Sequence, residues 1–306
     1  MPVILMATVG IVLGATLQAA PFDFREQTSP DAAQLVLSRD GRAWLSTQVT
    51  PFDRSSKERR EQTYKVFSHV YDFTGNAPIT KGAGGKYSHH RGLFIGWKDT
   101  LVGDKDYDTW HMSNCYQQHV QWLEQDARAD KATQSQRIRW CTPQDEAFIE
   151  EIRTISVSPS ADGMRVIDFH STLTALSGAI SLRGDLQHAG MQVRMANEVN
   201  EHQQSTQYIL PEGAEELDND EVVGAWWACC SPVVRGTRYW IVHMTPQTHP
   251  TGLPVYSIRR YARFGAFFEP KLEQGQALPL TFRVVVADTQ LDREACAALY
   301  AAYTTP

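Results

Sequence analysis

The sequence predicts an all-β fold, a single large antiparallel β-sandwich with a short C-terminal helix. Apolar and polar residues alternate along many short segments, and turn formers such as Asp-Gly separate several of them. Only the last stretch of the chain has a helical pattern. The 306 residues contain no internal repeat and no low-complexity linker, so we expect one domain over residues 21–306.

The N-terminal segment, residues 1–20, is apolar and ends in small residues before a polar segment. This pattern predicts a secretory signal that is cleaved near Ala20. No Lys or Arg precedes the apolar run, which leaves a retained anchor as the alternative. No other apolar run has the length of a membrane span. We therefore expect a secreted or periplasmic protein with no integral membrane association after cleavage.

The first half of the mature chain shows one hairpin, one loop and one unusual strand. Residues 33–49 alternate on either side of Arg39-Asp40-Gly41, and Asp-Gly favours a hairpin turn. The polar segment 52–63 predicts an exposed loop. Residues 81–97 pass from glycines through two histidines into an apolar run, which predicts a strand that is covered on both faces.

The second half predicts long antiparallel strands and one helix. Alternation with one polar face recurs in residues 119–129, 133–143, 147–159 and 163–176. Ser160 to Gly163 supplies the turn between the last two. Later strands are predicted in residues 238–246 and 277–289. A helix is predicted from Asp292, which is a favourable capping residue before good helix formers.

The charge of the chain excludes two classes of partner. The formal net charge is -6 and the pI is near 5.9. Lys and Arg form no basic stripe, which a nucleic acid or an anionic membrane would need. We therefore expect neither as a partner.

The five cysteines are an odd and sparse set for an exported chain. The spacing leaves open a disulfide between Cys115 and Cys141, which sequence alone does not establish. Cys229 and Cys230 follow an apolar Trp-Trp segment and are expected to be buried, unreactive thiols.

His89, His90 and Arg91 are the densest group of candidate site residues. If the segment is a strand, the two histidines point to opposite faces and do not both bind one metal. We expect one imidazole to act as an acid or base and Arg91 to bond a carboxylate or sugar hydroxyls. The alternative is that both imidazoles cap a loop. The glycines before them border this group, and a phosphate loop is disfavoured because no helix follows.

Two further groups lie downstream. Tyr107, Trp110 and His111 share a loop in which an aromatic ring and polar atoms suit a sugar, although Trp110 is equally consistent with a core residue. Arg194 and Glu198 share a face of an extended segment, where they either hold a ligand or form an exposed ion pair.

The last group lies in residues 249–261. Here His249 and three turn formers lead into a strand with Tyr256, Arg259 and Arg260. The two arginines face opposite ways, so one is expected in the site and the other in solvent; the alternative is that both are solvated. No nucleophile elbow, zinc-protease motif or dinucleotide fingerprint is present.

Several motifs resemble those of the PmoA-like domain family of unknown function. They are SHHRGLFIGW, TWH, GMQVRM, and HPTGLPVYSIRRYARFGAFFEP with LEQGQALPLTFRVVVAD. The family name refers to a membrane monooxygenase subunit, but this chain lacks the spans of that protein, so the name is not an activity. The resemblance implies an exported protein with a carbohydrate partner and a fold similar to the galactose mutarotase-like supersandwich. The family usually has Asp, His and Pro before the histidine pair, whereas this chain has Gly85-Lys86-Tyr87-Ser88.

Together these observations predict a carbohydrate-active enzyme that uses histidine acid/base chemistry of the epimerase, lyase or hydrolase type. We expect His89 or His90 as the acid or base and His111 with Arg91 as positioning groups. One alternative is a non-catalytic carbohydrate-binding module with Trp110, Tyr107 and Trp97 as its platform. The other is a metal-dependent enzyme in which a divalent ion is bound by His111 and one of the histidine pair. No other cofactor is predicted.

Overall fold

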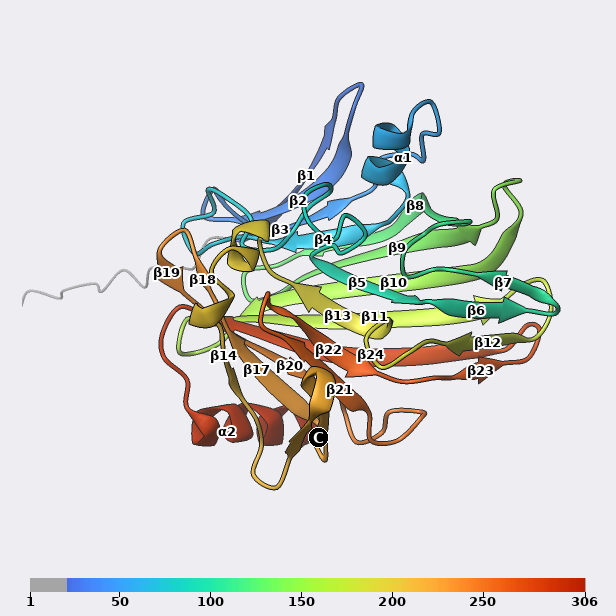
Figure 1. Ribbon diagram of the computed structural model, residues 1–306. Coiled ribbons are helices and arrows are strands. Elements are labelled where there is room, and N and C mark those ends of the chain that lie inside the picture. Colours follow the sequence, from blue (N-terminus) through green and yellow to red (C-terminus); the bar gives the residue numbers. More distant parts are fainter. Residues whose placement is uncertain (1–20, 306) are drawn as a thin grey trace, which may run out of the picture.

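Two large antiparallel sheets face one another in the computed structural model, which describes residues 21–305 (Figure 1). The ten-stranded sheet has the order β1-β2-β3-β4-β5-β13-β22-β21-β16-β15. Its strands are β1 Phe22–Thr28, β2 Ala33–Arg39, β3 Arg42–Gln48, β4 Phe67–Val70, β5 Leu93–Trp97, β13 Ala189–Arg194, β22 Arg263–Phe267, β21 Val255–Arg259, β16 Glu221–Val223 and β15 Glu215–Leu217.

The eight-stranded sheet has the order β14-β17-β20-β24-β11-β10-β9-β8. Its strands are β14 Gln207–Ile209, β17 Trp227–Ser231, β20 Trp240–Met244, β24 Ala277–Ala287, β11 Arg165–Ala175, β10 Ala147–Pro159, β9 Ala132–Cys141 and β8 Tyr116–Ala127. Two small sheets add β23 Lys271–Leu272, β12 Ile180–Arg183, β6 Asp99–Val102 and β7 Lys105–Tyr107, and β18 Val233–Val234 with β19 Thr237–Arg238. The helices are α1 Lys57–Thr63, α2 Arg293–Thr304 and the short 3-10 turns η1 Asn197–Asn200, η2 Gln203–Ser205 and η3 Asp218–Asp220. The predicted all-β fold class with a C-terminal helix is confirmed.

Most of the predicted elements are present. Strands β2 and β3 form the hairpin, and Asp40 and Gly41 between them have φ angles of 52° and 71°. Both values are positive, which the tight turns of hairpins require. The four long strands β8 to β11 are antiparallel neighbours, as their alternation predicts. Helix α2 follows Asp292, whose side chain accepts a hydrogen bond from the Ala295 amide.

Two predictions about local structure are wrong. The segment 52–63 contains the helix α1, because Ser56 caps its N-terminus by accepting a hydrogen bond from the Arg59 amide. Its charged sequence lacks the apolar period that normally reveals a helix. In residues 81–97 only β5 is a strand, and the polar part before it is an irregular loop.

The core lies between the two large sheets. Leu93, Ile95 and Trp97 on the inner face of β5 belong to it, together with residues of β9, β10, β11 and β24. On the outer face of β5, Phe94 packs with Phe67 and Trp110 in a separate cluster. Both faces of β5 are therefore covered, as predicted, and the outer face has an apolar floor on which a site can form.

Helix α2 packs on the other side of the sandwich, on the outer face of the eight-stranded sheet. Cys296 and Leu299 of this helix contact a second apolar cluster that includes Trp227, Val242 and Val285 of three neighbouring strands. The cysteines are free thiols and all are buried, so no disulfide joins Cys115 and Cys141.

The signal predicted over residues 1–20 lies outside the described residues. Within residues 21–305, none of the helices combines the length and the apolar character that crossing a bilayer requires.

Candidate functional site

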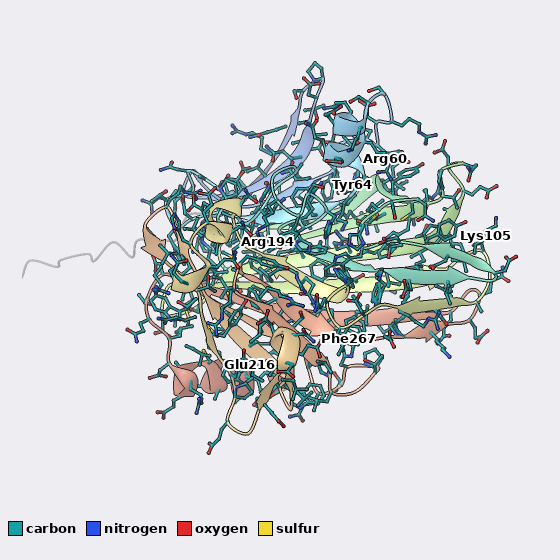
Figure 2. All side chains as sticks on the ribbon, viewed as in Figure 1. Arg60, Tyr64, Lys105, Arg194, Glu216 and Phe267 are labelled. Carbon is teal, nitrogen blue, oxygen red and sulfur yellow. The ribbon has the colours of Figure 1, made fainter. Side chains whose placement is uncertain are left out.

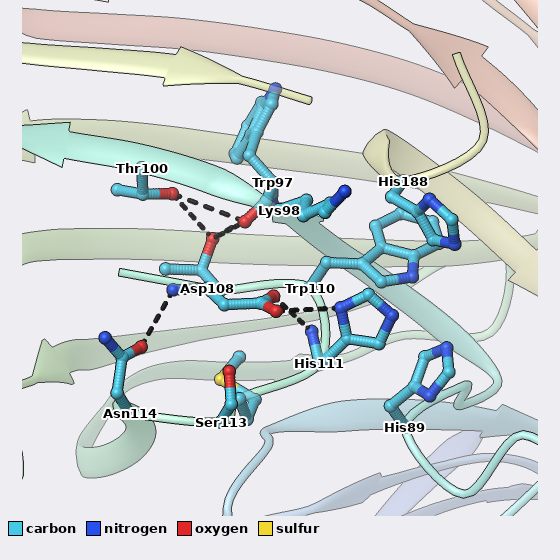
Figure 3. A network of polar contacts seen from close by, with 12 residues as sticks. His89, Trp97, Lys98, Thr100, Asp108, Trp110, His111, Ser113, Asn114 and His188 are labelled. Carbon is cyan, nitrogen blue, oxygen red and sulfur yellow. Dashed lines mark hydrogen bonds and ion pairs between the residues drawn. The ribbon is translucent and has the colours of Figure 1, made fainter. Parts of the chain in front are cut away.

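Four imidazoles gather on the outer face of the ten-stranded sheet, and we call His89, His90, His111 and His188 the histidine cluster. Figure 3 shows three of them, His89, His111 and His188. The ring centroids of His89 and His90 are 4.2 Å apart, and those of His89 and His111 are 4.3 Å apart. The His188 ring lies 5.1 Å from that of His111. The cluster therefore joins three loops that are distant in sequence.

The loop that carries His111 crosses directly over β5. The Trp110 amide donates to the Trp97 carbonyl at 3.0 Å, and the Thr109 hydroxyl donates to the same oxygen at 2.8 Å. A Cβ atom built on Gly96 would lie 2.5 Å from the Thr109 carbonyl oxygen. Only a glycine at this position lets the loop lie so close to the sheet.

The histidine pair lies in a turn before β5. Tyr87 has a positive φ of 54°, and the His90 amide donates to the Tyr87 carbonyl at 3.0 Å. This turn places the two imidazoles side by side. The prediction that His89 and His90 point to opposite faces is therefore wrong, because the extended backbone begins only at Leu93.

Lys65 holds the two loops together. Its ammonium donates to the Trp110 carbonyl at 2.6 Å and to the His89 carbonyl at 3.2 Å, and it lies 4.6 Å from the Phe94 ring centroid. Burial and the nearby charge of Arg91 lower the pKa of Lys65 well below its usual value. The residue fixes the separation of His89 and His111.

Two histidines of the cluster are held by aspartates in the same way. His111 Nδ1 lies 2.8 Å from Asp108 Oδ2, and His188 Nδ1 lies 2.6 Å from Asp185 Oδ1. In each pair the aspartate precedes the histidine by three residues. The side chains of His111 and His188 are 31% and 27% exposed, so solvent and ligands reach both rings.

The aspartates determine which ring nitrogen carries the proton. Burial alone would raise the pKa of Asp108, but hydrogen bonds from the His111 ring and amide outweigh it and lower the pKa. An ionised carboxylate only accepts hydrogen bonds, so Nδ1 of His111 must donate. Nε2 is then free to exchange a proton with a ligand. The same argument applies to Asp185 and His188, where burial lowers the histidine pKa and Asp185 opposes this.

His89 and His90 have a different environment. Burial and the charge of Lys65 lower the pKa of His89 to about 2, and burial and the charge of Arg263 lower that of His90. Both imidazoles are therefore neutral near pH 7. His89 Nε2 and His90 Nδ1 are buried and form no hydrogen bond in the described structure. They are suited to bonding a ligand rather than to carrying a proton.

The predicted arginines occupy three distinct environments. Arg91 is fully buried, donates to the carbonyls of Ser88, His90 and Glu61, and so anchors the histidine turn. Arg194, which is labelled in Figure 2, is also fully buried. Its guanidinium lies 4.8 Å from the Tyr261 ring centroid.

Arg259 and Arg260 do face different surroundings. Arg259 forms an ion pair with Asp220 at 2.9 Å. Arg260 is exposed and donates to the Thr206 carbonyl at 3.4 Å.

Four predicted residues do not reach the histidine cluster. Tyr107 stacks on Phe148 in the core at 4.7 Å. Tyr256 is on the inner sheet face, and His249 packs against Phe268 at 4.5 Å. The predicted pairing of Arg194 with Glu198 is also wrong, because β13 ends at Arg194 and Glu198 lies in η1, where it accepts from the Arg235 amide.

The aromatic platform predicted for a binding module is not formed. Trp97 and Trp110 are fully buried and Tyr107 is 8% exposed, so these rings present no open surface. The accessible aromatic ring at the cluster is Tyr87, which is 37% exposed and lies 4.8 Å from Tyr261.

His188, Asp108 and Asp185 were not among the predicted site residues. A local signal for them exists, because Asp-Thr-Trp-His at 108–111 and Asp-Leu-Gln-His at 185–188 repeat one Asp-x-x-His pattern. Two hollows border the cluster. One of about 570 Å³ is lined by Asp185, which bonds His188, and one of about 260 Å³ is lined by Lys65, which bonds the His89 carbonyl; the four histidines themselves line neither hollow.

The metal alternative has no matching donor arrangement within residues 21–305. No group of three or more His, Cys, Asp or Glu side chains there is arranged to hold a metal ion.

The fold and the cluster define an antiparallel β-sandwich protein with an aspartate-supported histidine site on one sheet. The chain belongs to a family of unknown function, DUF6807, which matches residues 34–301. The expectation of a family of unknown function is confirmed. The narrower expectation of the PmoA-like domain family stays a prediction. Among curated proteins, no sequence matches this chain.

Several solved structures are similar to it at low TM-scores, among them an epimerase homologue and a lyase. A GalM/aldose epimerase homologue from C. elegans has a TM-score of 0.37 and 8% identity, and covers 88% of this chain and 100% of its own. A polysaccharide lyase has a TM-score of 0.31 and 12% identity over 90% of this chain, which spans 34% of the lyase. Similarity at this level carries no argument about activity.

Proposed function

We propose that this protein is a carbohydrate-active enzyme in which His111 and His188 act as an acid/base pair on a sugar. The observation that carries the proposal is the pair of Asp-His dyads with rings 5.1 Å apart. Each aspartate fixes one ring nitrogen and leaves Nε2 for the substrate. One imidazole removes a proton while the other, when protonated, supplies one.

The neighbouring groups support chemistry on a sugar. The neutral imidazoles of His89 and His90 provide unpartnered polar atoms for hydroxyl groups. Tyr87 provides an exposed ring on which a sugar C–H face packs. Proton removal followed by proton return epimerises a carbon, and proton removal with loss of a substituent is an elimination. Both reactions need this pair of groups.

The test is turnover by the two single variants His111→Gln and His188→Gln. Wild-type protein is incubated with plant and algal oligosaccharides in D2O, and products and C–H exchange are followed by NMR. Each variant is expected to lose about 10²-fold or more of the turnover, as removal of a general acid or base does. His202→Gln, at an exposed position outside the cluster, serves as the control.

Undiminished turnover in both cluster variants would overturn the acid/base assignment. Tight oligosaccharide binding without product or exchange in the wild type would instead favour a binding module.

A further inference from the structure

Three arginines lie side by side on the outer face of the ten-stranded sheet. Arg194 of β13 is directly opposite Arg263 of β22, which is directly opposite Arg259 of β21. Residues that are opposite each other in antiparallel strands have their side chains on the same face. We call Arg194, Arg263 and Arg259 the arginine row. Arg263 lies 5.6 Å from the Trp110 ring, so the row begins beneath the histidine cluster.

The row is only partly neutralised. Arg259 is paired with Asp220, whereas Arg194 and Arg263 form no ion pair in the described structure. Arg263 donates to the Gln192 amide oxygen and the Ser257 hydroxyl, and three more cations of the same region bond only carbonyl groups. Five buried cations of this region, each at most 3% exposed, form no ion pair: Lys65, Lys81, Arg91, Arg194 and Arg263. Arg165, which lies outside this region, is also buried without an ion pair, but it is a single charge.

The chain neutralises a buried arginine elsewhere. Arg153 is 1% exposed and is held by Glu151 at 2.7 Å, and Glu151 also accepts from Trp140 and Ser171. A buried charge without a counter-charge is costly, and the cost grows when several such charges lie in one region, because they repel one another. Burial is the main cause that lowers the pKa of Lys81 to about 7, and the nearby charges of Arg91 and Arg194 lower it further.

Several donors of this region are buried and have no hydrogen-bond partner. They are Nε and Nη2 of Arg194, Nε of Arg263 and Nε1 of Trp110. Donors of this kind suit the oxygens of a carboxylate or sulfate, which accept several hydrogen bonds at once. Because the whole chain has a net charge of -6, this positive region also stands out from the rest of the molecule.

We propose that the sugar bound at the histidine cluster carries an anionic substituent, a carboxylate or a sulfate, whose charge is compensated by Arg194 and Arg263. The inference rests on the proposed function, since it names the substrate class of the same site. If the substituent is a carboxylate, compensation of its charge by the arginines would also let it accept electron density from the adjacent carbon and so favour deprotonation of that C–H bond.

Calorimetry with three defined probes tests the inference independently of turnover. The probes are trigalacturonate, a sulfated galactose trisaccharide and neutral galactotriose. We expect at least one anionic probe to bind tenfold or more tightly than the neutral one at 50 mM salt, with a smaller difference at 300 mM. The two anionic probes distinguish a carboxylate from a sulfate.

Single arginine variants test whether Arg194 and Arg263 cause the preference for anionic probes. Arg194→Lys and Arg263→Lys keep a charge but lose the planar fork, so each should reduce the anionic preference about tenfold. Arg165→Lys is the control, because Arg165 is 2% exposed and bonds the Tyr71 and Asp72 carbonyls outside this region. Unfolding curves establish that each variant is folded.

Equal binding of anionic and neutral probes, no binding of any probe, or an unchanged preference in both site variants would overturn the inference. Turnover of a neutral sugar that depends on His111 and His188 would leave the proposed function intact in that case. If the protein prefers the anionic probes but turns over no sugar, the inference of an anionic substituent would be supported and the proposed acid/base function would not.

Discussion

A single carboxylate distinguishes the histidines of this site from one another. His111 and His188 each donate Nδ1–H to an aspartate, whereas His89 has only cationic and aromatic neighbours and a pKa lowered to about 2. The aspartate fixes the tautomer and stabilises an imidazolium when one forms. Side chains of one chemical type therefore take different roles within a few ångströms.

Asp108→Asn tests this role at the level of one atom. An asparagine amide that donates to Nδ1 would force the proton of His111 onto Nε2, which then no longer accepts one. Turnover should fall by on the order of 10²-fold or more. The ¹⁵N chemical shifts of His111 should report the other tautomer, a change that a purely structural role would not produce. Unchanged shifts with full turnover would contradict the assignment.

At the level of single residues, part of the site could be predicted from the sequence. His89, His90 and His111 were predicted as site residues and do lie together. His188 was not chosen, because its proximity depends on the pairing of Trp97 with Ala189 across two strands. The local sequence of neither strand indicates how two strands that are distant in the chain pair with each other.

Among the elements, strand periodicity was reliable where the backbone is extended and failed where it is not. In β5 the alternation correctly separated the inner Leu93 and Ile95 from the outer Phe94. The same alternation applied to His89 and His90 gave the wrong faces, because Tyr87 has a positive φ and turns the chain. The alternation of side chains does not show where a strand begins if the residues before it are polar, as His89 and His90 are before β5.

The glycine beneath the His111 loop provides a test at the level of the element. In Gly96→Ala the new methyl group would lie 2.5 Å from the Thr109 carbonyl oxygen and would push the loop away from β5. We expect a loss of about 1–3 kcal/mol in the free energy of unfolding. Sugar binding should weaken as well, because His111 moves relative to His89. Urea titration and calorimetry measure the two effects.

The control is Gly163→Ala in the turn between β10 and β11. Gly163 has a φ of +78° and open space around it, so alanine strains the backbone without touching the site. That variant should lose stability but bind sugar normally. Normal binding by Gly96→Ala would show that the loop position is not set by this contact.

The molecule as a whole buries several neutral histidines, and this determines its response to acid. Burial lowers the pKa of His243 to about 3 and that of His249 to about 4. In the unfolded chain histidine has its usual pKa of about 6.5 and takes up protons first. Stability is thus complete above about pH 6.5 and is lost as the pH falls toward 4, by at most about 1.4 kcal/mol per pH unit for each such histidine.

Urea midpoints measured at pH 8, 7, 6 and 5 should therefore be constant at the upper end and fall below pH 6.5. His243→Gln should flatten this slope, and His202→Gln should not, because His202 is exposed. Equal midpoints at pH 7 and 5 would show that these histidines are not buried in neutral form.

The strand order also has a consequence for folding. The histidine cluster forms only after β5 and β13 have paired, and a long stretch of chain separates these two strands in sequence. Pairing of this kind must overcome the entropy of closing large loops, so it is slow compared with the formation of local hairpins such as β2–β3. No fragment shorter than residues 89–188 contains all four histidines of the cluster. In a refolding experiment, recovery of ligand binding should therefore lag behind recovery of β-structure.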